Sequence, residues 1–411
     1  MKRVEAIFLF LTLLFLPTQL GKHFWPQFSY IFSLRVDYLS PTIYFWDLLV
    51  GLLLVVWLIQ RQPINKKALN LFLFFILSQS LSLVNGNLGA GLVRLDQYLM
   101  AGLFGIYIAS AKWEVLRGKL FLPLSLAILG ESILAILQFL KGGTIGLWIL
   151  GERTFSITTP AIAKFDFRGF EFLRPYATFP HPNVLAGFMV IGIMLVSWIA
   201  YQGVNRRGGL LNLSMLLGTI TLLLTVSRVA LIAGVAMAMM TLSRRWKIVL
   251  VLLLIILSPI LFTRFEALFS FDSLTLIRRE ELSISAWQMF LSSPIFGIGL
   301  NNFIPASSEG LVSGPSRFLQ PVHNIFLLAL AETGILGLLG LLGLIGYPIW
   351  KLFKLRTTNP EPKTLLLIWV VIIFLGLFDH YFLTLPQGYR LLFLIWGISL
   401  SMLEWKNAKS S

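Results

Sequence analysis

The sequence predicts an all-α membrane protein that crosses the bilayer about twelve times, and three observations carry this expectation. The 411 residues are 57% hydrophobic and only 12% charged, which is far from the composition of soluble domains. The apolar residues gather in windows of about 20, the length of helix that crosses roughly 30 Å of hydrocarbon. Lysine and arginine recur in every second short connection between these windows.

The predicted spans are bounded by charged residues, glycine or proline. They lie at 4–20, 43–60, 68–84, 95–111, 119–140, 184–202, 210–226, 229–243, 247–263, 323–350, 364–379 and 389–404. The first window follows Met1-Lys2-Arg3, as in a signal peptide, but the bulky residues after Leu20 offer no small-residue cleavage site. We therefore expect it to remain as an anchor.

The basic residues predict the orientation of the chain in the membrane. With both termini in the cytoplasm, that side holds the short basic connections at 61–67, 112–119, 205–209, 243–247 and 351–363. It then carries 19 of the 33 basic residues and four acids, an excess equal to the net charge of +15. This is the positive-inside pattern, so the basic balance indicates topology and not a nucleic-acid partner.

The connections on the opposite face are much longer than the cytoplasmic ones. Two of them, 141–183 and 264–322, offer room for short helices and for chemistry. No internal repeat or linker marks a separate soluble domain, so we expect one integral membrane domain over residues 1–411. The chain has no cysteine, which excludes disulfides and thiol chemistry.

Polar side chains gather where the first long segment meets the membrane, in RPYATFPHPNVLAGF. Arg174, His181 and Asn183 lie there, and Pro182 suits the first turn of the next helix because its missing N–H has no partner at that position. Arg228 is the one charged residue in the stretch 210–243. It interacts either with headgroups or an outer acid, or with an anionic substrate.

The second long segment contains FDSLTLIRREELSISAWQMFLSSP, which predicts an amphipathic helix on the outer surface. Asp272 is a candidate cap and the helix ends before Pro294. The apolar face is formed by Leu282, Ala286, Met289 and Phe290. Arg278 and Arg279 lie in its first half, and the segment then leads through a glycine turn to His323 and Asn324 at the start of the next span.

The order of these motifs resembles the O-antigen ligase and O-antigen polymerase superfamily. The resemblance rests on ATFPHPNVLAGF, LLLTVSRVALIAG, RREELSISAWQMFLSSPIFGIGLNNF, HNIFLLALAETGILGLLG and FDHYFLTLPQGYRLLFLIWGI, and it covers residues 170–400. It implies a glycosyltransferase of type C architecture. It also implies transfer of a glycan from an undecaprenyl-diphosphate donor to an acceptor hydroxyl at the outer face of the cytoplasmic membrane, without a metal ion.

The residue types in these motifs suit that chemistry. A diphosphate leaving group needs cations or donors as charge develops, and a guanidinium offers a bidentate fork, so Arg228 and Arg279 are the predicted catalytic arginines. The family places an arginine about ten residues before the methionine of the outer helix, which matches Arg279. The tryptophan usual four residues after that arginine is Ser283 here, so Arg278 stays an alternative, or a solvated surface charge.

His323 is the predicted third catalytic residue. An imidazole can accept the proton of a sugar hydroxyl near neutral pH, or bind phosphate when it is protonated, and the sequence leaves both roles open. The residues expected to contribute to substrate binding are Arg174, His181, Asn183, Arg278 and Asn324. The four histidines show no ligand spacing and no cytoplasmic phosphate loop occurs, so we expect neither a metal nor a cofactor.

Other function classes remain possible at this level. A repeat-unit polymerase shares the donor chemistry and differs in its acceptor, which the sequence does not identify among a lipid, a protein and a glycan. A transporter or flippase is expected to show internal symmetry and ionisable residues near mid-bilayer in both halves. Here the polar residues concentrate on the outer side of the second half, which favours the enzyme over a transporter or a purely structural envelope protein.

Overall fold

The computed structural model describes residues 2–204, 208–266, 274–308, 319–355 and 361–410. Helices make up 74% of the chain. The strands in the described ranges are only two to four residues long. The expected predominance of α-helix is therefore confirmed.

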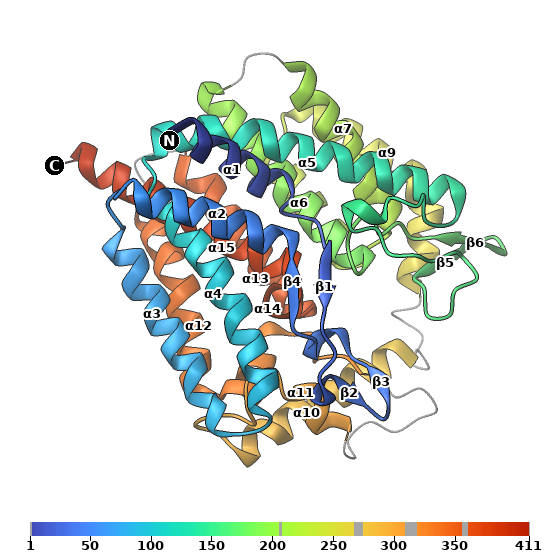
Figure 1. Cartoon of the computed structure of the whole chain (residues 1–411). Helices are drawn as coiled ribbons and strands as arrows, with labels where there is room; N and C mark the ends of the chain where they lie inside the picture. Colours follow the sequence, from blue (N-terminus) through green and yellow to red (C-terminus); the bar gives the residue numbers. More distant parts are fainter. Residues whose placement is uncertain (1, 205–207, 267–273, 309–318, 356–360, 411) are drawn as a thin grey trace. The chain divides into compact units, whose positions relative to one another are not determined.

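Each of the twelve predicted windows overlaps one α-helix of the structure. Most of these helices are labelled in Figure 1. These helices are α1 (Lys2–Leu14), α2 (Phe45–Ile59), α3 (Lys66–Ser80), α4 (Leu88–Ser110), α5 (Trp113–Lys141), α6 (Pro182–Ile199), α7 (Gly208–Thr225), α8 (Arg228–Thr241), α9 (Arg244–Glu266), α12 (Ile325–Leu355), α13 (Glu361–Phe378) and α15 (Pro386–Ser410). In the described part of the chain, six helical segments, those of α3 to α7 and α12, are long and apolar enough to cross a bilayer. The apolar helices of α2, α8 and α13 are shorter, so twelve crossings stay a prediction.

Short elements fill the connections. The strands form three antiparallel pairs: β1 (Gly21–His23) with β4 (Thr42–Tyr44), β2 (Tyr30–Ile31) with β3 (Leu34–Arg35), and β5 (Lys164–Phe167) with β6 (Phe170–Leu173). The remaining helices are the 19-residue α10 (Leu274–Ser292) and the short α11 (Phe303–Ser308) and α14 (Tyr381–Thr384). Single turns lie at Gln27–Ser29, Asp37–Leu39, Leu81–Val84, Trp148–Leu150 and Ala200–Val204. The two long predicted outer segments thus hold the β5–β6 hairpin, and α10 with α11.

The chain divides into two compact units, each built from separate stretches of sequence. Unit 1 comprises Met1–Leu16, Gly21–Leu120 and Arg278–Ser411, and unit 2 comprises Pro17–Leu20 and Phe121–Ile277. A single membrane domain over residues 1–411 stays a prediction.

The core of unit 1 is an assembly of long helices in which α15 packs along α4, and α12 packs against α3 and α13. Small residues bring α4 and α15 close together. A Cβ atom on Gly397 would lie 2.5 Å from the carbonyl oxygen of Gly105. Only glycine allows this approach, which is the type of contact that stabilises helix pairs in membranes, where packing replaces the hydrophobic effect.

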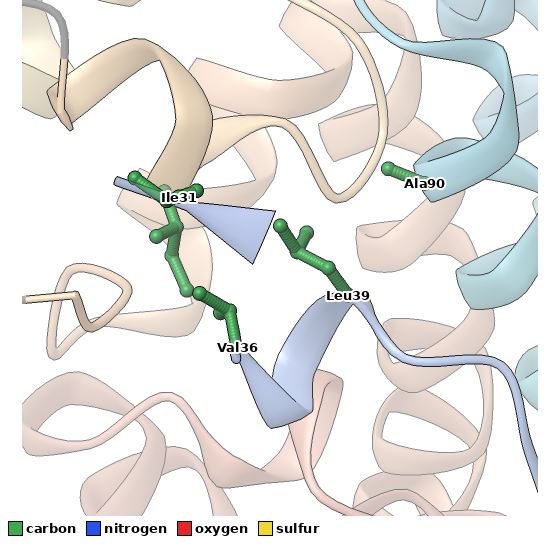
Figure 2. Packing of buried hydrophobic residues seen from close by; sticks show 5 residues of the cluster. Ile31, Val36, Leu39 and Ala90 are labelled. Carbon is green, nitrogen blue, oxygen red and sulfur yellow. The ribbon is translucent and has the colours of Figure 1, made fainter. Parts of the chain in front are cut away.

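The segment before α2 folds onto the same unit through a small apolar cluster. Ile31, Val36 and Leu39 pack with Ala90 of α4 and Ile304 of α11 (Figure 2). Tyr38 is partly buried against this cluster. The cluster therefore fixes the backbone around Tyr38 beside the start of α4.

Helix α12 is broken at Gly334, whose φ of 63° and ψ of −165° lie outside the helical region. The chain after α10 supplies the hydrogen bonds that the break removes. The N–H groups of Ile298 and Gly299 donate to the carbonyls of Ala331 and Glu332, and those of Ile335 and Leu336 donate to Pro294 and Ile295. Non-helical backbone at membrane depth is tolerated when protein groups satisfy it in this way.

Unit 2 is organised around α6, which packs against α7 and α8. The polypeptide turns between α7 and α8 at Val226, whose φ is 47°, and Ser227 takes the N-cap position of α8. In the same unit, the buried carboxylate of Glu131 accepts hydrogen bonds from the N–H and hydroxyl of Thr178 at 3.0 and 2.7 Å. This contact holds the stretch that leads into α6 against α5.

Candidate functional site

His323 lies two residues before α12 in unit 1. Its Nδ1 is buried and finds no hydrogen-bond partner within the described residues. Burial lowers the pKa of the imidazole below its ordinary value, Asp379 opposes this by favouring the charged form, and Arg279 adds to the lowering. The ring is therefore poised to be neutral near pH 7, with a buried nitrogen left to bind a proton or a donor.

A second histidine packs against the first. The ring centroid of His380 lies 5.2 Å from that of His323, with the planes at 74°. His380 is buried at the start of α14, and its Nδ1 lies 2.6 Å from the hydroxyl of Thr384. The ring centroid of Tyr38 lies 5.7 Å from that of His380. Three rings from distant parts of the sequence thus form one cluster in unit 1.

The two candidate arginines of the outer helix lie on α10. Its predicted apolar face is confirmed, since Leu282, Ala286 and Met289 are buried. Arg278 and Arg279 are partly exposed in the first turns, and the effect of Arg279 on the pKa of His323 places its charge within electrostatic reach of that ring. The candidate cap, Asp272, lies outside the described residues.

Asn324 has a clear structural task. Its Oδ1 accepts hydrogen bonds from the N–H groups of Phe326 and Leu327 at 2.9 and 3.0 Å, so it caps α12. These two donors at the helix start are therefore engaged within the protein. The expected contribution of Asn324 to substrate binding stays a prediction.

Arg174, His181 and Asn183 come together in unit 2. The buried guanidinium of Arg174 donates from Nε to the carbonyl of Thr225 at 2.6 Å and from Nη2 to Oδ1 of Asn183 at 2.7 Å. His181 caps α6 by accepting the N–H of Asn183 at Nδ1, and Pro182 occupies the first turn as expected. Arg174 therefore ties the start of α6 to the end of α7.

Arg228 is the first residue of α8, at the break that follows Thr225. It is partly exposed in unit 2. The predicted spans 210–226 and 229–243 meet at this position, as do the observed helices α7 and α8. Arg228 thus follows Thr225, whose carbonyl accepts the bond from Arg174, by three residues, and it lies at a helix N-terminus, where the helix dipole favours an anion.

The structure gathers the predicted residues into two groups. Unit 1 holds His323, Asn324, Arg278 and Arg279, and unit 2 holds Arg174, His181, Asn183 and Arg228. Each group contains both arginine and histidine, side chains that suit an oxyanion and a titrating hydroxyl. The role of each residue stays a prediction.

Two residues near His323, Asp379 and His380, were not among the predicted site residues, and neither was Arg94, which binds the carbonyl of Thr384 in the same unit. Asp379 and His380 stand in the quoted stretch FDHYFLTLP, but nothing in the sequence placed them beside His323. Arg94 lies immediately before the window predicted as a span at 95–111, and a charged residue near a span is expected to have a polar partner. Arg94 is buried on α4 and makes three hydrogen bonds there.

No group of three or more His, Cys, Asp or Glu side chains that could hold a metal occurs in the ranges the structure describes. Metal-independent chemistry remains a prediction, because it concerns the reaction itself.

Comparison with protein families gives one match: residues 213–342 fit the family model described as O-antigen ligase. The matched stretch runs from α7 into α12 and includes Arg228, Arg279 and His323. Comparison with curated proteins gives no match. The resemblance drawn from the sequence is confirmed over the matched residues. Residues 213–342 are thus similar to the O-antigen ligase family, and the apolar helices of the described residues are consistent with a membrane protein of polysaccharide biosynthesis.

Proposed function

We propose that this protein is a metal-independent glycosyltransferase that moves a glycan from an undecaprenyl-diphosphate donor to an acceptor hydroxyl at the outer face of the cytoplasmic membrane. The observation that carries the proposal is the surroundings of His323. A partly buried imidazole with an unpaired buried Nδ1 among the described residues lies within the electrostatic reach of Arg279 and Asp379. It lies in the segment that matches the O-antigen ligase family.

The proposed reaction is a displacement at the anomeric carbon of the donor glycan. The acceptor oxygen forms a bond to that carbon, and the bond from the carbon to the diphosphate oxygen breaks. His323 takes the proton of the acceptor hydroxyl, and the leaving diphosphate keeps the electron pair of the broken bond. The protein therefore needs one base and a cationic binding site for the leaving group.

The environment of His323 favours the base over the phosphate ligand. Burial lowers the pKa of its imidazole, so the ring is neutral and has a lone pair before the substrate binds. A bound diphosphate would favour the charged imidazole, and it would then strengthen the base as the proton arrives.

The leaving group is assigned to arginine. Arg279 is the best candidate in unit 1 because its charge already acts on His323. Arg228 is the candidate in unit 2, where it begins α8 beside a helix N-terminus. A guanidinium binds two phosphate oxygens at once, which fits charge that develops on a leaving diphosphate.

The residues proposed for substrate binding have different contacts in the structure, and we therefore propose different roles for them. Arg174, His181 and Asn183 bond one another or their own helix start, so we propose that they shape the surface on which substrate rests. Arg278 is the partly exposed neighbour of Arg279 and is proposed as a second phosphate contact. Asn324 supports the loop that carries His323.

The test uses purified protein in lipid, a lipid-diphosphate glycan as donor, and a panel of lipid, protein and glycan acceptors. We expect release of the lipid diphosphate in step with glycan transfer, and full activity in the presence of a metal chelator. Transfer onto another repeat unit would identify a polymerase, and transfer onto a lipid or a protein a ligase. Movement of intact donor across the bilayer without bond cleavage would overturn the enzyme in favour of a flippase.

A further inference from the structure

The short helix α14 is held at its C-terminal end by two side chains from one face of α4. Arg94 donates from Nη1 to the carbonyl of Thr384 at 2.7 Å, and Tyr98, one turn further along, donates from its hydroxyl to the carbonyl of Leu383 at 3.0 Å. The last carbonyls of a helix have no partner within the helix. Arg94 and Tyr98 therefore supply the missing donors and fix the position of α14 in unit 1.

Arg94 also acts, through Asn301, on Tyr38, whose ring packs against His380. Nη2 of Arg94 donates to Oδ1 of Asn301 at 2.9 Å, and Nδ2 of Asn301 donates to the carbonyl of Tyr38 at 3.1 Å. The ring of Tyr38 contacts the ring of His380. Since Arg94 is 1% exposed, these bonds form without competition from water, and its planar fork sets their directions.

The two contacts of the Thr384 hydroxyl favour one tautomer of His380. Oγ1 of Thr384 lies 3.1 Å from the carbonyl of His380 and 2.6 Å from Nδ1 of its ring. A hydroxyl has one hydrogen to donate, and a carbonyl oxygen can only accept. Both contacts are satisfied together only when Thr384 donates to the carbonyl and Nδ1–H donates to Thr384. Neutral His380 then carries its lone pair on Nε2.

We propose that Arg94 and Thr384 are positioning residues that hold His380 in its Nδ1–H tautomer against His323, and that glycan transfer depends on this hold. Because the centroids of the two rings lie 5.2 Å apart, the orientation of His323 depends on the position of His380. Arg94 acts through the backbone of α14, and Thr384 acts through its hydroxyl. The kinetic part of the proposal rests on the proposed function, whereas the tautomer does not.

The experiment compares Thr384→Val with Thr384→Ser. Valine keeps the shape of threonine and the backbone carbonyl that Arg94 binds but removes the hydroxyl, and serine keeps the hydroxyl. We expect kcat to fall about tenfold in Thr384→Val with KM nearly unchanged, and to return to within about twofold of the parent in Thr384→Ser. The matched control is Thr12→Val, a buried threonine whose hydroxyl donates to the carbonyl of Phe8 in its own helix.

The tautomer is read separately by solid-state NMR on protein labelled with ¹⁵N-histidine in lipid. The chain has four histidines, so the signal of His380 is assigned from its loss in His380→Gln. We expect a protonated Nδ1 and an unprotonated Nε2 in the parent, and loss of this preference in Thr384→Val.

A parent with the Nε2–H tautomer would overturn the proposal, and so would a Thr384→Val variant with parental tautomer and kcat. An equal fall of kcat in Thr12→Val would also overturn it, because the effect would then be general loosening. If the parent transfers no glycan to any acceptor, the proposed function fails, and the NMR result still decides the hold on His380. Arg94→Lys completes the series, because an ammonium lacks the fork; it is expected to weaken the tautomer preference and kcat together.

Discussion

At the scale of single residues, the chemistry depends on groups whose ordinary properties are altered by their neighbours. His323 is shifted toward its neutral form by burial and by Arg279, while Asp379 pulls in the opposite direction. These three groups belong to unit 1, and their charges act on one ring. Their balance sets the pH at which the imidazole gains a proton.

This balance predicts the pH dependence of kcat/KM, which reports on the free enzyme. A base with a lowered pKa stays active down to a pH below 6.5, the ordinary histidine value, and loses activity only as the pH falls further. Removing the charge in Asp379→Asn lowers the pKa of His323 further, so the acid limb moves to lower pH. Removing the charge in Arg279→Gln raises the pKa, so the limb moves to higher pH. Rate–pH profiles of the three proteins check the signs, and shifts in the same direction would contradict the assignment.

Arg228 gives a second prediction at this scale. If it binds the diphosphate through two oxygens, Arg228→Lys is expected to lose nearly as much transfer activity as Arg228→Ala, because an ammonium is a point charge without a fork. Initial rates at matched protein levels provide the measurement. Parental activity in the lysine variant would return Arg228 to a role at the lipid headgroups.

At the scale of helices and strands, most boundaries follow from the sequence and the broken helix does not. Windows of apolar residues identified the helices, and the apolar spacing of Leu282, Ala286 and Met289 identified the buried face of α10. Hydropathy did not predict the break in α12, because Gly334 lies in an apolar, glycine-rich stretch. Proximity of His380 to His323 was also hidden, since spacing along a chain does not report distance across a bundle.

The break at Gly334 predicts a specific sensitivity. A Cβ atom there would lie 2.3 Å from the carbonyl oxygen of Ile295, and the positive φ disfavours any L side chain. Gly334→Ala is therefore expected to destabilise the protein by about 1–3 kcal/mol or more. Gly346→Ala lies in the same helix with no heavy atom within 4 Å of the added carbon, so it is the control and is expected to be neutral or slightly stabilising. Thermal unfolding in detergent compares them, and equal loss in both variants would contradict this account of the break.

At the scale of the whole molecule, the charge distribution predicts which side each segment faces. Basic residues concentrate in alternate connections. The candidate residues other than Arg228 lie in or beside the long segments 141–183 and 264–322, and Arg228 lies between α7 and α8. The orientation of the chain in the membrane follows from the distribution of basic residues, so it is predicted from the sequence and not from the fold. The positions of the arginines and histidines within the outer segments required the structure.

Because the chain has no cysteine, single substitutions can test the topology in the full-length protein. Thr158→Cys lies exposed in the first long segment, and Ser243→Cys lies exposed in a short basic connection. In intact spheroplasts a membrane-impermeant maleimide is expected to label the first and to spare the second until the membrane is opened. Labelling of the second alone would move the long segments, and the proposed site with them, to the cytoplasmic side.

The central claim is that His323 is the base for glycan transfer, and the most direct measurement is single-turnover transfer by His323→Ala with donor binding measured on the same preparation. The account predicts a rate about 100 to 10,000 times lower than that of the parent, with donor affinity largely retained. Donor binding lost together with turnover would make His323 a phosphate ligand. Transfer at the parental rate by a folded variant that binds donor would contradict the claim outright.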